Sequence, residues 1–229
     1  MDERDLEQFK RQISLSGALL PGKIGEQHLE REISRAQQIH ARVTDYLNAP
    51  RTFIKTTIDI DGTDLAFELD NLYGDCIVNY RAGRLGARHL LEAWVQHLAA
   101  NINKPDTTTL FVFRGAKDDA KVSRLQPVDP GTAETVLGNL LGLYNEGVAS
   151  PLLLPPDACR AFTEGRQRGM DVESAILKTR QGWDWDQPGA EGKDRYWARL
   201  FQLPEAFHDR FINDAELIWQ PILEAIVDE

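Results

Sequence analysis

The sequence predicts an α/β (α+β) fold, with a central mixed sheet of four or five strands, helices on both sides of it and a helical C-terminal half. Three observations predict this class. Residues 57–81 alternate apolar and polar residues between turn signals, as strands do. Residues 88–100 change to a helical period. Beyond residue 129 the helical period recurs in successive segments, many of them bounded by proline, glycine or a capping aspartate.

The clearest strand pair lies between residues 57 and 73, where apolar residues alternate on both sides of an Asp61-Gly62 turn. A second turn at residues 73–75 leads into a third strand, residues 76–81. The remaining elements follow from the same two periods. We expect strands over 107–113 and 121–128, and helices over 2–13, 25–49, 88–100, 130–146, 157–167, 171–181, around 196–201 and from about 214.

Composition limits the functional classes. The chain has 229 residues, 42% of them hydrophobic, enough for one large domain or two small ones. Its net charge of -10 argues against a protein that coats nucleic acid, because lysine and arginine drive phosphate binding. Its two cysteines, Cys76 and Cys159, suggest a reducing compartment. The chain has no signal-peptide core and no apolar run of about 20 residues, so we expect a cytoplasmic protein without a membrane anchor.

The candidate site lies where the second and third strands end. Asn79 and Arg81 are two residues apart, so they share a face of their strand, and Asp70 on the neighbouring strand could point to the same place. A carboxylate followed by such a pair is the skeleton of a metal-dependent nuclease site. That chemistry requires two carboxylates for the cation and a lysine to position the attacking water. Asparagine is a poor Mg²⁺ ligand and arginine does not release its proton, so this site has the right shape and the wrong chemistry.

Five segments, in order along nearly the whole chain, resemble the C-terminal region of the RecC family, the gamma chain of exodeoxyribonuclease V (the RecBCD helicase–nuclease). They are SGALLPGKIGEQHLE, FELDNLYGDCIVNYRAGRLGARHLLEAWVQHLA, VLGNLLGLYNEGVASPLLLPP, KTRQGWDWDQPGAEGKDRYWARLF and ELIWQPILEAI. LDNLYGD followed by YRAGRLGAR is the most specific of them.

The resemblance implies a PD-(D/E)xK restriction-endonuclease-like core that has lost its catalytic residues. Asn79-Tyr80-Arg81 would then stand where the active RecB subunit carries Asp-Tyr-Lys, with Asp70 as the remnant of the site. It further implies one C-terminal domain of a longer chain over residues 1–229, with a helix-and-sheet core over 1–128 and a helical part over 129–229 packed on it.

The function implied by the resemblance is non-catalytic: to scaffold RecB-like and RecD-like subunits and to help guide or split DNA during double-strand break repair and recombination. Mg²⁺ and ATP would be used by the partner subunits, with no cofactor or metal in this domain. The alternative is an active metal-dependent deoxyribonuclease that uses Asp70 and Glu68, which share a strand face. No histidine or cysteine spacing indicates a zinc site.

Two other groups of residues are candidates for contact. Arg81, Arg84 and Arg88 could bind DNA, a phosphate or an acidic partner; the alternative, which we prefer, is a set of surface salt bridges with Asp70 and Asp75. Trp183 and Trp185 could stack on single-stranded bases or anchor a loop against the body or a partner, and their acidic neighbours favour anchoring.

The hairpin of the strands over 107–113 and 121–128, with its charged turn over 114–120, could serve as a strand-splitting pin of the kind attributed to RecC. We prefer the alternative that residues 114–120 are a plain connecting turn.

Overall fold

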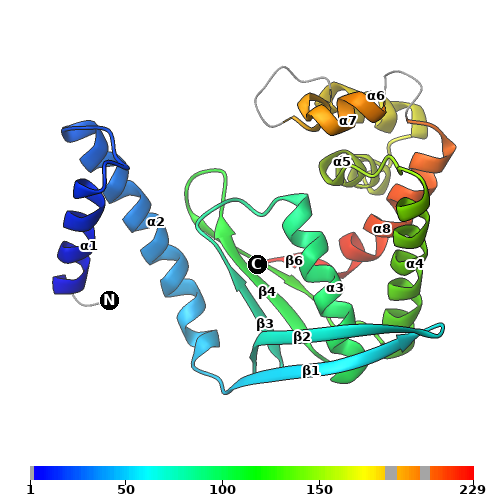
Figure 1. The fold of residues 1–229 in the computed structure, drawn as a ribbon, viewed down its shortest axis with the longest axis horizontal. Helices are drawn as coiled ribbons and strands as arrows, with labels where there is room; N and C mark the ends of the chain where they lie inside the picture. The colour runs from blue at the N-terminus through cyan, green and yellow to red at the C-terminus, as the bar shows by residue number, and fades with distance from the viewer. Residues whose placement is uncertain (1–2, 184–189, 202–206) are drawn as a thin grey trace.

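The computed structural model describes residues 3–183, 190–201 and 207–229 and contains a mixed six-stranded sheet in the order β1-β2-β3-β4-β5-β6 (Figure 1). Neighbouring strands are antiparallel except β3 and β4, which are parallel. The strands are β1 Arg51–Ile60, β2 Thr63–Tyr73, β3 Cys76–Tyr80, β4 Thr108–Arg114, β5 Ala120–Leu125 and β6 Ile226–Asp228.

The described helices are α1 Glu3–Leu15, α2 Lys23–Leu47, α3 Ala87–Asn103, α4 Pro130–Ala149, α5 Pro156–Gln167, α6 Val172–Trp183, α7 Arg195–Leu200 and α8 Asp209–Ala225, with a short 3-10 helix at Glu191–Lys193. The predicted mixed α/β class is therefore confirmed. Several boundaries differ from the prediction: β1 begins at Arg51 rather than at residue 57, β5 ends at Leu125 rather than at residue 128, and the last helix begins at Asp209 rather than near residue 214. A sixth strand follows that helix.

Local chemistry accounts for the element boundaries. The turn between β1 and β2 places Asp61 at φ 52° and Gly62 at φ 80°, the left-handed pair that a two-residue hairpin turn requires. Helix α4 begins at Pro130 because Asp129 caps it: the Asp129 carboxylate accepts a hydrogen bond from the Thr132 amide at 3.0 Å.

The two faces of the sheet are covered by different helices. On one face, Ile39 and Val43 of α2 pack against Val78 and Leu110. On the other, α3 packs its apolar face against Ile77 and Phe111, through Leu90, Trp94 and Leu98. Because α3 connects the parallel strands β3 and β4, the end of β3 and the first turns of α3 lie next to each other (Figure 1).

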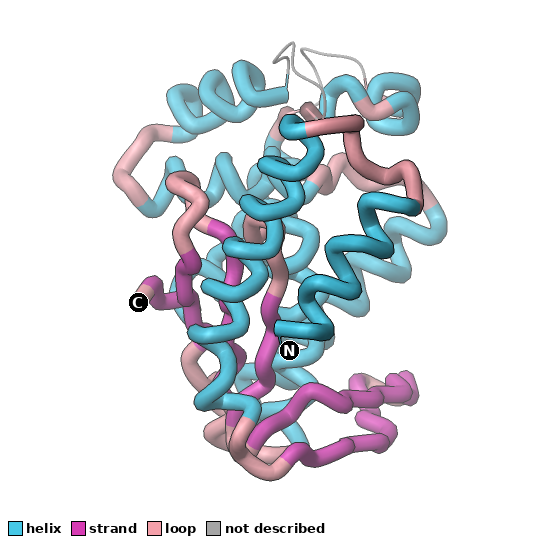
Figure 2. The backbone as a smooth tube through the Cα atoms, turned by 90° about the vertical axis from the view of Figure 1, so that its left-hand side faces the viewer, coloured by secondary structure: helices cyan, strands magenta, loops and turns pink. Residues whose placement is uncertain are grey.

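The β1–β2 hairpin projects away from the rest of the sheet. Only two residue pairs, Leu72 with Ile77 and Tyr73 with Cys76, join β2 to β3. From there the hairpin runs out to α4, where Ile60 lies near Gly138 (Figures 1 and 2). One hydrophobic cluster extends from this hairpin through α3 and α4 to Trp219 of α8, so residues on both sides of position 128 share it.

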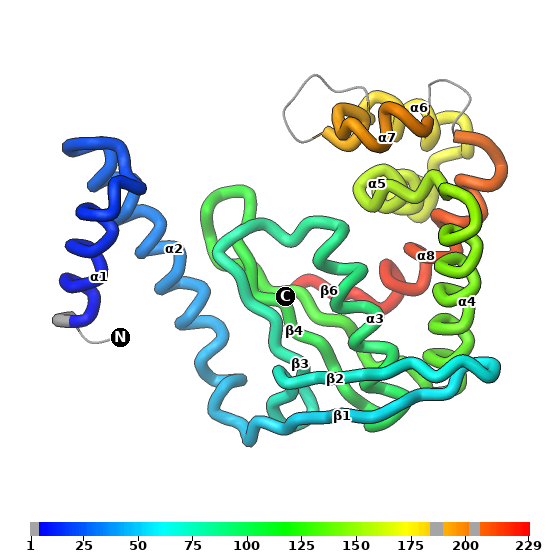
Figure 3. Tube along the Cα trace, in the orientation of Figure 1, coloured from blue at the N-terminus to red at the C-terminus, as the bar shows by residue number. Residues whose placement is uncertain are grey.

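Helix α1 lies alongside the N-terminal half of α2, away from the sheet (Figure 3). Their facing surfaces, which include Phe9 and Ile33, line a shallow apolar groove. Among the residues that the structure describes, no helix has the length and apolarity needed to cross a membrane.

Candidate functional site

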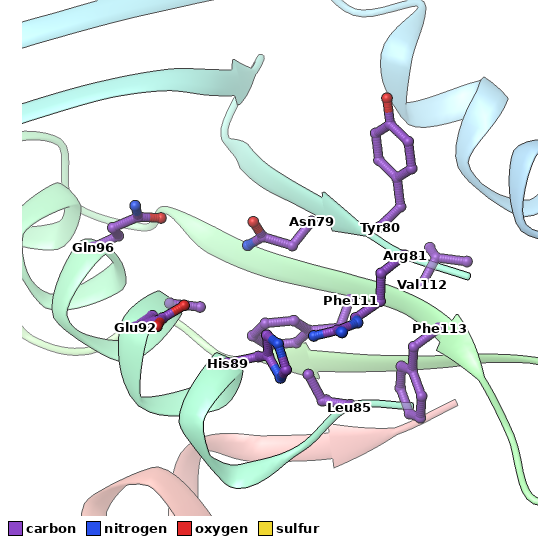
Figure 4. A pocket seen from close by; sticks show the side chains of 11 residues that line it. Asn79, Tyr80, Arg81, Leu85, His89, Glu92, Gln96, Phe111, Val112 and Phe113 are labelled. Carbon is purple, nitrogen blue, oxygen red and sulfur yellow. The ribbon is translucent and has the colours of Figure 1, made fainter. Parts of the chain in front are cut away.

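The end of β3 and the first turns of α3 enclose a cleft of about 250 Å³ (Figure 4). Its lining is partly polar and partly aromatic. The polar side chains come from β3 and α3, and the apolar floor comes largely from β4. The lining includes Asn79, Arg81, Leu85, His89, Glu92, Gln96, Phe111 and Phe113.

Asn79 and Arg81 point to this cleft, whereas Tyr80 between them points to the opposite side of the sheet (Figure 4). The predicted two-residue pair is therefore confirmed as a shared face. Asn79 is held by a residue that the sequence analysis did not select, because Asn71 of β2 donates a hydrogen bond from Nδ2 to Asn79 Oδ1 at 3.1 Å. Since Oδ1 is the acceptor of that bond, Nδ2 of Asn79 is turned away from Asn71, and this buried atom has no hydrogen-bond partner among the described residues.

Arg81 is fixed by its own loop. Its amide donates to the Val112 carbonyl at 2.9 Å, and the Gly83 carbonyl accepts from the Arg114 amide at 3.0 Å. A Cβ at Gly83 would lie 3.1 Å from Nη2 of Arg81 and 3.2 Å from Nε, so the guanidinium rests against the bare glycine backbone. Nε of Arg81 is buried and has no hydrogen-bond partner among the described residues.

The expected approach of Asp70 to Asn79 is wrong. Asp70 accepts a hydrogen bond from Arg51 at 3.1 Å, its side chain is 71% exposed, and it does not line the cleft. The cause is the alternation of β2 itself. Asp70 shares the exposed face of the strand with Glu68, opposite Leu69 and Asn71, so it points away from Asn79.

Glu68, the second carboxylate of the alternative site, forms an exposed ion pair with Lys55. It also lies outside the cleft lining. The structure therefore leaves Glu68 and Asp70 each beside a basic residue of β1, and does not bring either one to Asn79 and Arg81.

The three arginines of the predicted basic cluster do not form one site. Arg81 lines the cleft, Arg84 is exposed outside the lining, and Arg88 pairs with Glu92 one turn along α3 at 3.0 Å. The alternative of salt bridges from these arginines to Asp70 and Asp75 is wrong, because those carboxylates pair instead with Arg51 and Lys104.

Trp183 is 5% exposed and packs edge-on against Phe207, with ring centroids 5.6 Å apart. This favours the predicted anchoring against the body over base stacking. Its neighbour in the prediction, Trp185, lies outside the described residues. Glu191, one of the acidic residues near the two tryptophans, accepts hydrogen bonds from the first amides of α5, those of Asp157 and Ala158, at 2.9 and 2.8 Å.

The polar residues buried under α3 have a structural role. His97 Nε2 donates to the Gln126 carbonyl at 3.0 Å, so Nδ1 accepts from the Thr109 hydroxyl at 2.9 Å in a neutral ring. Burial lowers the pKa of His97 to about 4, which keeps the ring neutral at physiological pH. Among the residues described, no group of three or more histidine, cysteine, aspartate or glutamate side chains is placed to hold a metal ion.

Asn71 was not among the site residues predicted from sequence. Its signal was present, because Asn71 continues the apolar series Leu65, Phe67 and Leu69 with a polar side chain. A polar residue on a core-facing strand position requires a partner, and here the partner is Asn79.

Comparison with known proteins places the chain in a family. A model of the RecC C-terminal domain matches residues 1–167. The RecBCD enzyme subunit RecC of Mycolicibacterium smegmatis is 26% identical over 159 residues, which are 69% of this chain and 15% of that protein. The same subunit of Mycobacterium tuberculosis H37Rv is 25% identical over 158 residues, 68% of this chain and 14% of the relative.

The RecBCD enzyme subunit RecC of Escherichia coli K12 is 23% identical over 233 aligned residues, which cover 97% of this chain and 20% of that protein. The chain thus spans a fifth or less of the length of these curated relatives. Because the family model covers well over half of the sequence, the chain belongs to the RecC C-terminal domain family.

Proposed function

We propose that this chain is a non-catalytic, nuclease-like domain of a RecC-type subunit. It scaffolds RecB-like and RecD-like subunits of a helicase–nuclease and helps to guide DNA during double-strand break repair and recombination. Membership of the RecC C-terminal domain family supports the assignment to this complex. The degenerate-nuclease part of the proposal rests on the chemistry of the cleft.

The observation that carries the proposal is that Arg81 lines the cleft at the end of β3. A guanidinium stays protonated at all working pH values, so it neither coordinates a cation nor accepts a proton from water. Its positive charge also opposes Mg²⁺ binding beside it. The carboxylate among the lining residues, Glu92, already accepts from Arg88 at 3.0 Å. This lining supports a site that has lost hydrolytic chemistry. In the proposed complex, ATP and Mg²⁺ are used by the partner subunits.

The alternative is a metal-dependent deoxyribonuclease that uses Glu68 and Asp70. Its supporting observation is that both carboxylates lie on the exposed side of β2. Each is beside a basic residue, Lys55 or Arg51, which competes with a cation for the same oxygens. The degenerate cleft therefore fits the described residues better than an active site on β2.

The test is residual nuclease activity in the assembled complex. A RecBCD-type complex whose RecB-like nuclease has been inactivated is incubated with linear DNA and Mg²⁺ or Mn²⁺. We expect no degradation above that of a mock preparation, and normal co-purification of the subunits. Degradation that disappears in Asp70→Ala or Glu68→Ala would contradict the proposal and establish the alternative.

A further inference from the structure

The cleft at the end of β3 contains two buried hydrogen-bond donors with no acceptor among the described residues, Nε of Arg81 and Nδ2 of Asn79. Buried polar atoms without partners are uncommon, because each costs the free energy of the hydrogen bond that it gave up to water. Both atoms donate and neither accepts. A ligand that pairs with both atoms must therefore supply acceptor oxygens.

Both donors are held in place before any ligand arrives. The hydrogen bond from Asn71 fixes the amide of Asn79, and the contact with Gly83 fixes the guanidinium of Arg81. Figure 4 shows the Arg81 guanidinium beside Phe111 and His89 inside the cleft. A guanidinium fixed in this way presents its N–H groups as a fork, which matches the two oxygens of a carboxylate.

We propose that this cleft binds the carboxylate of an aspartate or glutamate side chain from a partner subunit. The inference rests on the proposed function in one respect, that the partners of this domain are protein subunits. Arg81 would take the carboxylate in a charge-assisted contact, and Nδ2 of Asn79 would donate to one of its oxygens. Leu85, Phe111 and Phe113 would pack around the methylene stem.

The size of the cleft favours a side chain. At about 250 Å³ it is smaller than the roughly 300–1,000 Å³ typical of sites for drug-sized ligands. Its charge favours a single carboxylate over a DNA backbone. Arg81 is one cation, Glu92 contributes a carboxylate to the same lining, and the whole chain carries a net charge of -10. DNA binding depends on several cations along the backbone, which this lining does not supply.

The test measures the affinity of the full-length RecC-type chain for its purified RecB-like and RecD-like subunits by fluorescence titration. Arg81→Gln removes the charge and keeps a polar side chain. Asn79→Asp keeps the shape of the side chain and the acceptor for Asn71, but replaces the free donor with a carboxylate oxygen. We expect each variant to weaken association with one subunit by roughly tenfold or more, mainly through faster dissociation.

Arg84→Gln is the matched control, because Arg84 is an exposed arginine three residues away and outside the lining. We expect its affinity to stay within about twofold of the wild-type value. If Arg81→Gln does not fold, Asn79→Asp carries the test alone, since it is isosteric with the native residue.

Three results would overturn the inference. Unchanged association in Asn79→Asp and Arg81→Gln would exclude a partner carboxylate. Weaker binding of single-stranded or duplex DNA with unchanged subunit association would identify a phosphate ligand. A lower unfolding temperature of the full-length chain, again with unchanged association, would place the carboxylate in the RecC-type chain itself. Each of these results is distinct from residual nuclease activity, which tests the proposed function.

Discussion

Arg35 of α2 donates a hydrogen bond to Asp118, in the turn between β4 and β5 and 83 residues further along the chain. The Arg35 side chain is 9% exposed and also pairs with Glu32, one turn earlier on α2. The contact links α2 to the turn of the β4–β5 hairpin. A turn fastened in this way fits the connecting role that we preferred over a strand-splitting pin.

Asp118→Asn tests this contact without disturbing the backbone. Asp118 has a φ of 63°, and asparagine accepts the left-handed conformation about as well as aspartate. Removing the negative charge leaves a largely buried guanidinium with one carboxylate fewer. We expect a lower unfolding temperature, measured by circular dichroism. Asp61→Asn is the control, because Asp61 is also left-handed, at φ 52°, but has no ion pair within the described residues.

The same contact predicts a pH dependence. The hydrogen bond from Arg35 lowers the pKa of Asp118 below its ordinary value of 3.8. A carboxylate with a lowered folded-state pKa stabilises the fold above the ordinary value, and that contribution is lost as the pH falls through the lowered pKa. The difference in unfolding temperature between wild type and Asp118→Asn should therefore shrink below pH 3.8. A difference that stays constant down to pH 2 would show that charge is not its cause.

His97 predicts a second loss of stability, in milder acid. Burial lowers its pKa from 6.5 to about 4, so the unfolded chain binds a proton that the folded chain rejects. The contribution of the neutral His97 ring to the free energy of unfolding is fully present above pH 6.5. It decreases by about 3 kcal/mol as the pH falls to about 4. Urea unfolding at pH 7 and pH 4.5 measures the loss. His97→Gln should be less stable at pH 7 and lose less on acidification.

His89→Gln, at an exposed histidine of the same helix, is the control for this measurement. It should follow the wild-type pH dependence. An identical acid loss in His97→Gln would show that other groups titrate in this range.

Replacing two helix glycines by alanine should have opposite effects on the free energy of unfolding. A Cβ at Gly142, an exposed position of α4, would meet no atom within 4 Å. Gly142→Ala should therefore raise the free energy of unfolding by about 0.5–1 kcal/mol through helix propensity alone. A Cβ at Gly25, near the start of α2, would overlap the Leu20 carbonyl. Gly25→Ala should lower stability, and equal effects of the two substitutions in chemical denaturation would contradict the packing at Gly25.

Gly83→Ala tests the support of Arg81. The new methyl group would lie 3.1 Å from Nη2, so the guanidinium has to shift by a few tenths of an ångström. We expect little change in the unfolding temperature, because the loop lies at the edge of the core, and weaker subunit association in the titration described above. Association equal to that of wild type, with Arg81→Gln still impaired, would show that Arg81 does not need this support.

Much of the sheet follows from sequence because its signals are local. The Asp61-Gly62 turn, the alternation in β2 and the four-residue spacing of Leu90, Trp94 and Leu98 each depend on neighbouring residues, and each is confirmed. The two-residue pair Asn79 and Arg81 was also predicted correctly, because a strand as short as β3 leaves no room for an irregularity.

The residues that surround Asn79 and Arg81 could not be predicted from local sequence signals. Asn71 meets Asn79 from the core face of β2, and that contact depends on how β2 pairs with β3, which the sequence does not state. The partners of Asp70 and Asp75, Arg51 and Lys104, are likewise set by pairing between distant segments. The sixth strand was missed because its residues continue the apolar series of the preceding helix, and pairing with β5 overrides that pattern.

That last pairing bears on the order of folding. Ser123 of β5 and Asp228 of β6 are hydrogen-bonded across 105 residues of chain, a segment that contains all the helices from α4 to α8. Closing so long a segment has an entropic cost that three paired residues cannot offset alone. The edge strand is therefore expected to join the sheet late, after α8 has packed. Its pairing with β5 should form only in molecules whose helical half has already assembled.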